Sequence, residues 1–211
     1  MSKWLDPQLC GELEPLQAPE ELLEGAQDRL VQGLDLSGLD LSDLRWERSR
    51  FQRCRFSGAV LTGTECVDVV FEDCDLSNCL WSRAYLCRCL FRNEKGVGLD
   101  WTGAGLHYVT LEDSLFRYGN LSGGRLNKVR LIRCDLSEAA VSQAALKETS
   151  FQECVLRKTS FFKTSLSGQD FSTSTVEGLV ISDTAEELKG LTVRYDQAAE
   201  LAKLLGLRVV G

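Results

Sequence analysis

Residues 34–56, LDLSGLDLSDLRWERSRFQRCRF, carry a hydrophobic side chain at every fifth position, beginning with Leu36, Leu41 and Trp46. The same register continues to Ile181, and Gly96 is its only member that is not hydrophobic. An α-helix repeats about every 3.6 residues and a strand about every 2, so neither would turn every fifth residue inward. A backbone that turns a corner every five residues would do so. The pattern therefore predicts an all-β solenoid.

A second period, of twenty residues, indicates how many pentads complete one coil. Aromatic side chains recur at multiples of twenty, and small residues, often cysteine, recur in the same way two positions before a pentad centre. Four pentads per coil would stack these residues in columns inside the solenoid, with backbone hydrogen bonds between coils. The predicted core columns contain Phe51, Phe71, Phe91, Phe151, Phe171, Cys54, Cys74, Cys134 and Cys154.

Four cysteines between residues 74 and 89 raise the alternative of a metal site, because clustered thiolates bind zinc and iron–sulfur centres. In the pentad register Cys74, Cys79 and Cys89 take the small inward position, whereas Cys87 points outward. Cysteines that point inward from different sides of a coil act as small core residues. We therefore predict no metal and no cofactor, and Cys87 and Cys10 stay as candidates for exposed thiols.

The composition suits one ordinary domain or one compact repeat array. The chain has 211 residues, 44% of them hydrophobic, with no long apolar run and no secretion signal, so we expect a cytoplasmic protein with free thiols and no membrane contact. The formal charge of -7 argues against direct nucleic-acid binding through a basic surface. The single histidine, His107, stands at an outward position without a nucleophile motif, so we predict no enzyme.

The two ends leave the simple repeat, which divides the chain into residues 1–33, 34–183 and 184–211. The first segment carries Leu22, Leu23, Ala26, Leu30 and Val31 at helical spacing, which predicts a capping helix, and a partly ordered acidic tail is the alternative. The last segment has an apolar helical stripe, Gly206 as a stop signal and a short LRVV strand. An amphipathic helix that follows a complete solenoid needs a partner surface.

Residues 34–183 resemble the pentapeptide-repeat family, whose pattern A-(D/N)-L-x-x is represented by LDLSG, CDLSN, GNLSG and CDLSE. The resemblance implies a right-handed quadrilateral parallel β-helix. The ending, Gly-x-x-Val followed by Gln-Ala-x-x-Leu-Ala-x-x-Leu-Gly, resembles that of the Qnr and MfpA group, in which this module joins two chains end to end. The dimerisation residues implied are Leu191, Val193, Ala198, Leu201, Ala202, Leu204, Leu205, Leu207 and Val209.

The resemblance to that group also implies a partner. Its members bind DNA gyrase and topoisomerase IV, and their dimeric rod is described as a DNA mimic that protects the enzyme from quinolones or a natural poison. The acids that would imitate phosphates are Asp40, Asp43, Glu72, Asp73, Glu112, Asp113 and Asp135. The alternative is structural, because the charge sign alternates from coil to coil and ion pairs between coils would use the same acids. The alternative function is a scaffold for another protein that leaves gyrase unaffected.

Overall fold

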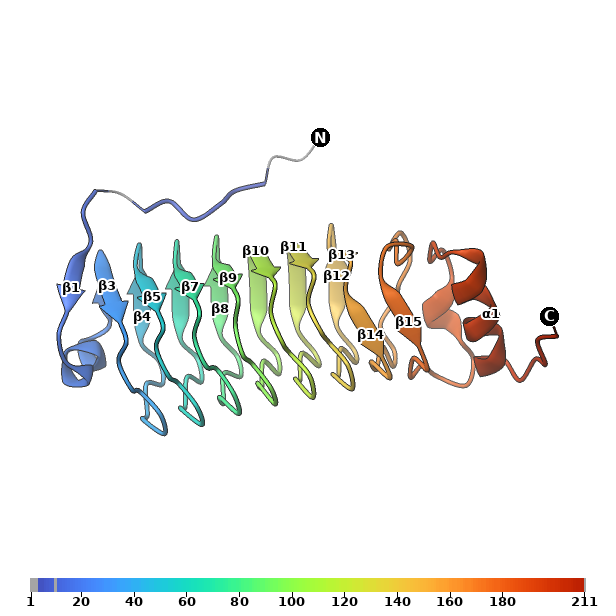
Figure 1. Ribbon diagram of the computed structural model, residues 1–211, viewed down its shortest axis with the longest axis horizontal. Helices are drawn as coiled ribbons and strands as arrows, with labels where there is room; N and C mark the ends of the chain where they lie inside the picture. Colours follow the sequence, from blue (N-terminus) through green and yellow to red (C-terminus); the bar gives the residue numbers. More distant parts are fainter. Residues whose placement is uncertain (1–3, 10, 211) are drawn as a thin grey trace.

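The chain winds into a rod of stacked coils in the computed structural model, which describes residues 4–9 and 11–210 (Figure 1). The coils follow one another along the long axis from β1 to β15, an extended arm runs along one side, and helix α1 lies at the far end. The helical elements are the 3-10 helices η1 (Pro19–Glu24) and η2 (Glu186–Leu188) and the α-helix α1 (Tyr195–Leu204). The strands are β1 (Glu14–Leu16), β2 (Ala26–Gln27), β3 (Arg29–Gln32), β4 (Arg45–Glu47), β5 (Arg50–Gln52), β6 (Glu65–Val67), β7 (Val70–Glu72), β8 (Tyr85–Cys87), β9 (Leu90–Arg92), β10 (Gly105–Glu112), β11 (Arg125–Ile132), β12 (Ala145–Lys147), β13 (Ser150–Gln152), β14 (Val155–Arg157) and β15 (Thr175–Glu177).

Parallel pairing between coils confirms the predicted period of twenty and the parallel β-solenoid. Phe51 pairs with Phe71, and Phe71 with Phe91, as β5, β7 and β9 stack. On the neighbouring face β4, β6 and β8 stack in the same way, and the longer strands β10 and β11 continue around the corner to join the two faces. The other two faces are linked by single parallel bridges such as Asp75↔Lys95.

The pentad centres fill the interior of the rod. The rings of Phe51 and Phe71 stack with centroids 4.9 Å apart, and those of Phe71 and Phe91 with centroids 4.7 Å apart. Phe151 and Phe171 meet edge to face at 5.3 Å. All five side chains are buried, so aromatic contacts add to the burial of apolar area along the column.

The small inward position has a hydrogen-bonding role in addition to its size. The Cys79 thiol donates to the Phe56 carbonyl oxygen at 2.8 Å, and the Thr164 hydroxyl donates to the Val141 carbonyl oxygen at 2.6 Å. Cys54, Cys74, Cys134 and Cys154 donate in the same way to a carbonyl twenty-three residues earlier. This explains why cysteine, serine and threonine recur there, since each is small and also carries a donor.

The predicted N-terminal capping helix is wrong. Residues 19–24 form one short 3-10 helix, and Ala26 and Val31 then lie in β2 and β3, which pair with β4 and β5. These two residues are spaced five apart and continue the register back from Leu36, so strand pairing competes successfully with the helical pattern. Gly25 lies between the 3-10 helix η1 and strand β2. A larger residue would not fit there, because a Cβ would lie 2.6 Å from the Arg45 carbonyl oxygen.

The solenoid therefore extends beyond both predicted boundaries, at residues 34 and 183. Parallel pairing begins at Glu14 in β1 and includes a bridge between Asp170 and Thr192. Helix α1 ends before Gly206, as expected, with Gly206 in the left-handed region at φ 76°. The predicted LRVV strand is not formed, because residues 207–210 have no neighbouring strand at this end of the rod.

Gly96 does not mark a bulge. Its N–H donates to the Leu115 carbonyl oxygen at 2.7 Å, and Lys95 pairs with the coils on both sides. The Phe116 ring fills the space of the missing side chain, since a Cβ at Gly96 would lie 2.7 Å from its Cδ1 atom. Glu94 points into the core beside this site, and both its carboxylate oxygens lack a hydrogen-bond partner within the described part of the chain.

Candidate binding surfaces

Arginines and glutamates alternate along the face that carries β5, β7, β9, β10 and β11. Arg92 lies between Glu72 and Glu112, with nitrogen–oxygen distances of 3.2 Å to each. Arg133 contacts Glu112 at 2.8 Å and Asp113 at 2.6 Å. The hydrogen bonds from Arg133 lower the pKa of Asp113 below its usual value. This face therefore carries the ion-pair ladder that the alternating charges predict.

The seven acids considered for a phosphate-like row lie in different environments. Asp40 and Asp135 each accept a hydrogen bond from the backbone N–H two residues later, which stabilises the turn of the Asp-Leu-Ser motif. Asp73 accepts from the Asn93 amide at 2.5 Å. Asp43 is exposed and forms no ion pair with any described residue. The structure does not bring the seven together as one unpaired row.

A second ion-pair column, which the sequence reasoning missed, occupies the adjacent corner. The Arg48 guanidinium binds both carboxylate oxygens of Asp28, and Arg88 binds both of Asp68 at 2.7 and 2.6 Å. Burial is the largest single influence on the pKa of Asp68 and would raise it, but the hydrogen bonds from Arg88 and the Gln8 N–H, together with the charges of Arg88 and Arg48, lower that pKa. The available signal was the opposite charge at positions twenty residues apart.

The C-terminal module closes the end of the rod. The Gln197 side-chain amide donates to the carbonyl oxygen of Ser174 at 2.6 Å and to that of Phe171 at 2.9 Å, which also accepts from the Ser174 N–H. Its side-chain oxygen accepts from the Arg194 N–H at 2.7 Å and so supports the helix start, although Arg194 is a poor N-cap. Leu201 is buried against the rod.

The residues assigned to dimerisation differ in how far they are exposed. Leu191, Val193 and Leu201 pack against the core of their own chain. Ala198 is exposed and Ala202 is half-buried. Leu204, Leu205, Leu207 and Val209 are exposed, with exposures between 38% for Leu204 and 59% for Leu207. Only the second half of the module thus leaves an apolar surface without a partner among the described residues.

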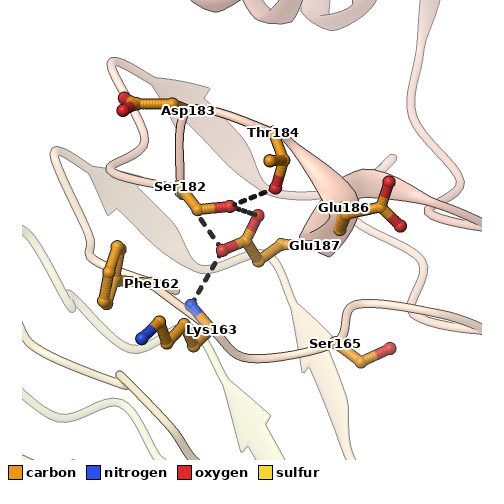
Figure 2. Close-up of a pocket in the computed structure, with 8 residues that line it drawn as sticks. All are labelled: Phe162, Lys163, Ser165, Ser182, Asp183, Thr184, Glu186 and Glu187. Atoms are coloured by element: carbon orange, nitrogen blue, oxygen red, sulfur yellow. Dashed lines mark hydrogen bonds between the residues drawn. The ribbon is translucent and has the colours of Figure 1, made fainter.

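A hollow of about 580 Å³ opens where the last coil meets this module, as Figure 2 shows. Glu187 points inward, and its carboxylate accepts hydrogen bonds from the Lys163 N–H at 2.8 Å and from the Ser182 N–H and hydroxyl at 3.0 and 2.8 Å. One coil earlier the equivalent N–H, that of Gln143, binds a backbone carbonyl. Glu187 therefore substitutes for a missing coil, and its carboxylate is already satisfied.

The cysteines of the predicted cluster and the single histidine lie in different environments. Burial raises the pKa of Cys79 and Cys89 to about 12, which disfavours the thiolate that metals and electrophiles require. Cys87, expected to point outward, is only 7% exposed, and Cys10 lies outside the described residues. Asn127 contacts His107 Nδ1 at 2.9 Å. No cluster of three His, Cys, Asp or Glu residues suited to a metal occurs in the described ranges, and no helix there is long and apolar enough to cross a membrane.

Comparison with known proteins agrees with this architecture. The family model for pentapeptide repeats, eight copies of the motif, matches residues 32–65. Residues 32–65 of this chain therefore carry pentapeptide repeats. The coil of four pentads continues well beyond the matched residues, as the parallel bridges up to Asp170↔Thr192 demonstrate. No curated protein is significantly similar to the chain in sequence.

Several solved structures are similar to this chain. A trypsin-treated variant of QnrB1, a plasmid-mediated fluoroquinolone resistance protein, has a TM-score of 0.42 and 18% identity over 86% of this chain and 99% of its own. HetL from the cyanobacterium Nostoc, involved in heterocyst differentiation regulation, has a TM-score of 0.28 and 18% identity over 78% and 84%. A protein of the Arabidopsis thaliana thylakoid lumen has a TM-score of 0.24 and 20% identity over 82% and 74%. Likenesses at this level do not distinguish functions.

Proposed function

We propose that this protein is a non-catalytic binding protein that joins end to end as a dimer and binds DNA gyrase, with topoisomerase IV as a second target. Binding would shield the enzyme from quinolones or a natural topoisomerase poison. The proposal combines the resemblance of the C-terminal ending to the Qnr and MfpA group with the apolar surface at the end of the rod.

That apolar surface is the observation that carries the proposal. Leu205 and Leu207 are more than half exposed, and residues 207–210 form neither helix nor strand. A second copy related by a twofold axis would supply both an apolar surface and a strand edge, since an isologous interface presents the same residues twice. The joined rods would double the length of surface available to a partner.

The distribution of carboxylates decides which acids are the best contacts for a basic DNA-binding saddle. Glu72, Glu112 and Asp113 are held by arginines, so a partner would have to replace these pairs before it gained from them. Asp43 needs no such exchange. We therefore expect Asp43→Asn to weaken binding to gyrase more than Asp113→Asn does, since long-range attraction depends on uncompensated charge.

A supercoiling assay with gyrase and ciprofloxacin tests the proposal. We expect the protein to restore supercoiling in the presence of the drug, or to inhibit gyrase at higher concentration. The Leu205→Glu/Leu207→Glu variant should lose the effect, and Leu80→Glu, an exposed leucine on the side of the rod, should retain it. Neither protection nor inhibition over a wide concentration range would overturn the proposal.

The ion-pair ladder favours a second candidate function, that of a scaffold that presents a rigid face to another protein. Ion pairs between Arg92 and its two glutamates make this face nearly neutral, which suits a protein partner better than the imitation of a polyanion. A pull-down in which one other protein is recovered in stoichiometric amount, with gyrase unaffected, would support the scaffold and contradict the topoisomerase proposal.

A further inference from the structure

The N-terminal arm, residues 4–9, lies along the face that carries β5, β7, β9, β10 and β11, without joining the solenoid. It forms neither helix nor strand, and in Figure 1 it runs beside the rod from the first coil toward β10 and β11. The Gln8 N–H donates to Asp68 at 3.0 Å, and the Trp4 ring packs on the Arg130 guanidinium at 4.7 Å. Asp68 and Arg130 are about three coils apart, roughly 14 Å, so the arm crosses about three coils between Gln8 and Trp4.

Arg130 binds the arm in two ways. Its guanidinium carbon lies over the Trp4 ring, and its Nη2 atom donates to Asp6 at 3.2 Å. The same guanidinium also donates to the Thr110 hydroxyl, which fixes its orientation. Arg130 therefore contacts an aromatic ring and a carboxylate two residues later on one peptide segment.

The arm covers its face incompletely. A hollow of about 550 Å³ remains between Pro7, Leu9 and the rod, with Val70, Leu90 and Ile132 as its apolar floor. Arg50 and Arg92 lie at its border, and the Arg50 Nε atom is buried without a hydrogen-bond partner among the described residues. Asp6 stays 77% exposed in its ion pair. Contacts of this exposed kind are individually weak, so the arm is displaceable.

We propose that this face is a docking surface for an extended segment of a partner protein that carries an aromatic side chain followed two positions later by a carboxylate. The arm occupies the same contacts and competes with that segment. Displacement would give the partner the Arg130 contacts together with the apolar floor and the free donor of Arg50. The proposal does not depend on whether the partner is a topoisomerase.

The test uses the full chain with the arm freed by Trp4→Ala and Asp6→Ala, two changes outside the coils. The probe is a fluorescein-labelled peptide with the sequence of residues 2–9, SKWLDPQL, and binding is followed by anisotropy. We expect saturable binding to the double variant and binding at least about tenfold weaker to the unchanged chain, because the arm occupies the site there. Adding Arg130→Gln to the double variant should abolish binding. Adding Arg117→Gln, on another face, should not.

Three results would overturn the proposal. The first is no saturable binding to the double variant, with unchanged thermal unfolding as evidence that the variant is folded. The second is equal binding of SKWLDPQL and of the control peptide SKALAPQL. The third is arm-dependent self-association beyond a dimer in sedimentation, which would mean that the face accepts the arm of a second copy.

Discussion

The body of the rod and its C-terminal end satisfy their polar groups in different ways. In the body each coil pairs with the next through backbone groups twenty residues apart, and the small inward residues donate to carbonyls of the preceding coil. At the C-terminal end the carboxylate of Glu187 and the amide of Gln197 replace a missing coil. The repeat therefore specifies the body, while individual side chains outside the repeat specify where it stops and what it can bind.

The largest effect is expected in the body. Phe71 is fully buried between the rings of Phe51 and Phe91, so Phe71→Ala should remove about 3–5 kcal/mol of the free energy of unfolding. Phe162, which is 38% exposed, is the matched control, and Phe162→Ala should change stability by less than about 0.5 kcal/mol. Urea unfolding measures both. Equal losses would contradict the assignment of the stacked column to the core.

A smaller but clear loss is expected at the C-terminal end. Gln197→Ala removes the donor of the Ser174 carbonyl and one of the two donors of the Phe171 carbonyl, which also accepts from the Ser174 N–H, and this should reduce the free energy of unfolding by about 1–3 kcal/mol. Lys203→Ala on the exposed side of α1 is the control. If thermal unfolding of the Gln197 variant matches that of the control, the module does not close the rod.

One buried residue of the body, Glu94, should make the free energy of unfolding depend on pH. Burial raises the pKa of Glu94 well above its ordinary value of 4.5, so the folded state holds a proton that the unfolded chain releases. The stability contributed by protonated Glu94 is complete below about pH 4.5 and is lost as pH rises through the folded-state pKa. The unchanged protein should thus lose stability relative to Glu94→Gln over that range. A difference independent of pH would show that Glu94 is not buried as a carboxylic acid.

The smallest effect on stability is expected from changes in the ion-pair ladder. Arg133 and Asp113 are exposed, so Arg133→Gln should change the melting temperature less than Gln197→Ala does, and added salt should remove the difference. A double-variant cycle with Asp113→Asn measures the coupling between the two side chains. A coupling that persists in high salt would show that the ladder stabilises the rod more than exposed pairs usually do.

The sequence was sufficient for the body and insufficient for the ends. Every-fifth-residue spacing predicts the coils, because each pentad repeats the same inward and outward positions. Around Leu22 to Val31 the sequence predicted a helix, because the hydrophobic residues at 22, 23, 26, 30 and 31 also fit a helical stripe. Only the pairing of β3 with β5 in the folded rod decides between helix and strand there. The contacts of Arg130 with the arm join residues 124 positions apart, which no local pattern reports.

The acids illustrate the same limit at the candidate site. Their positions relative to the pentad centres could be read from the sequence, whereas their neighbours could not. Glu112 binds Arg92 from the preceding coil and Arg133 from the following one, while Asp43 has no ion pair with the described residues. Whether a carboxylate is available to a partner depends on which arginine rotamers reach it across coils, and that is a property of the folded rod.

Sedimentation of the purified protein tests most directly the central claim, that the body is self-sufficient while the C-terminal end requires a second copy. We expect a dimer for the unchanged protein. For Leu205→Glu/Leu207→Glu we expect a monomer, because burial of each leucine contributes about 1.5–3 kcal/mol and their loss weakens association by at least about 100-fold. Leu80→Glu should stay dimeric. A monomer at all concentrations for the unchanged protein, or a dimer for the double variant, would contradict the account.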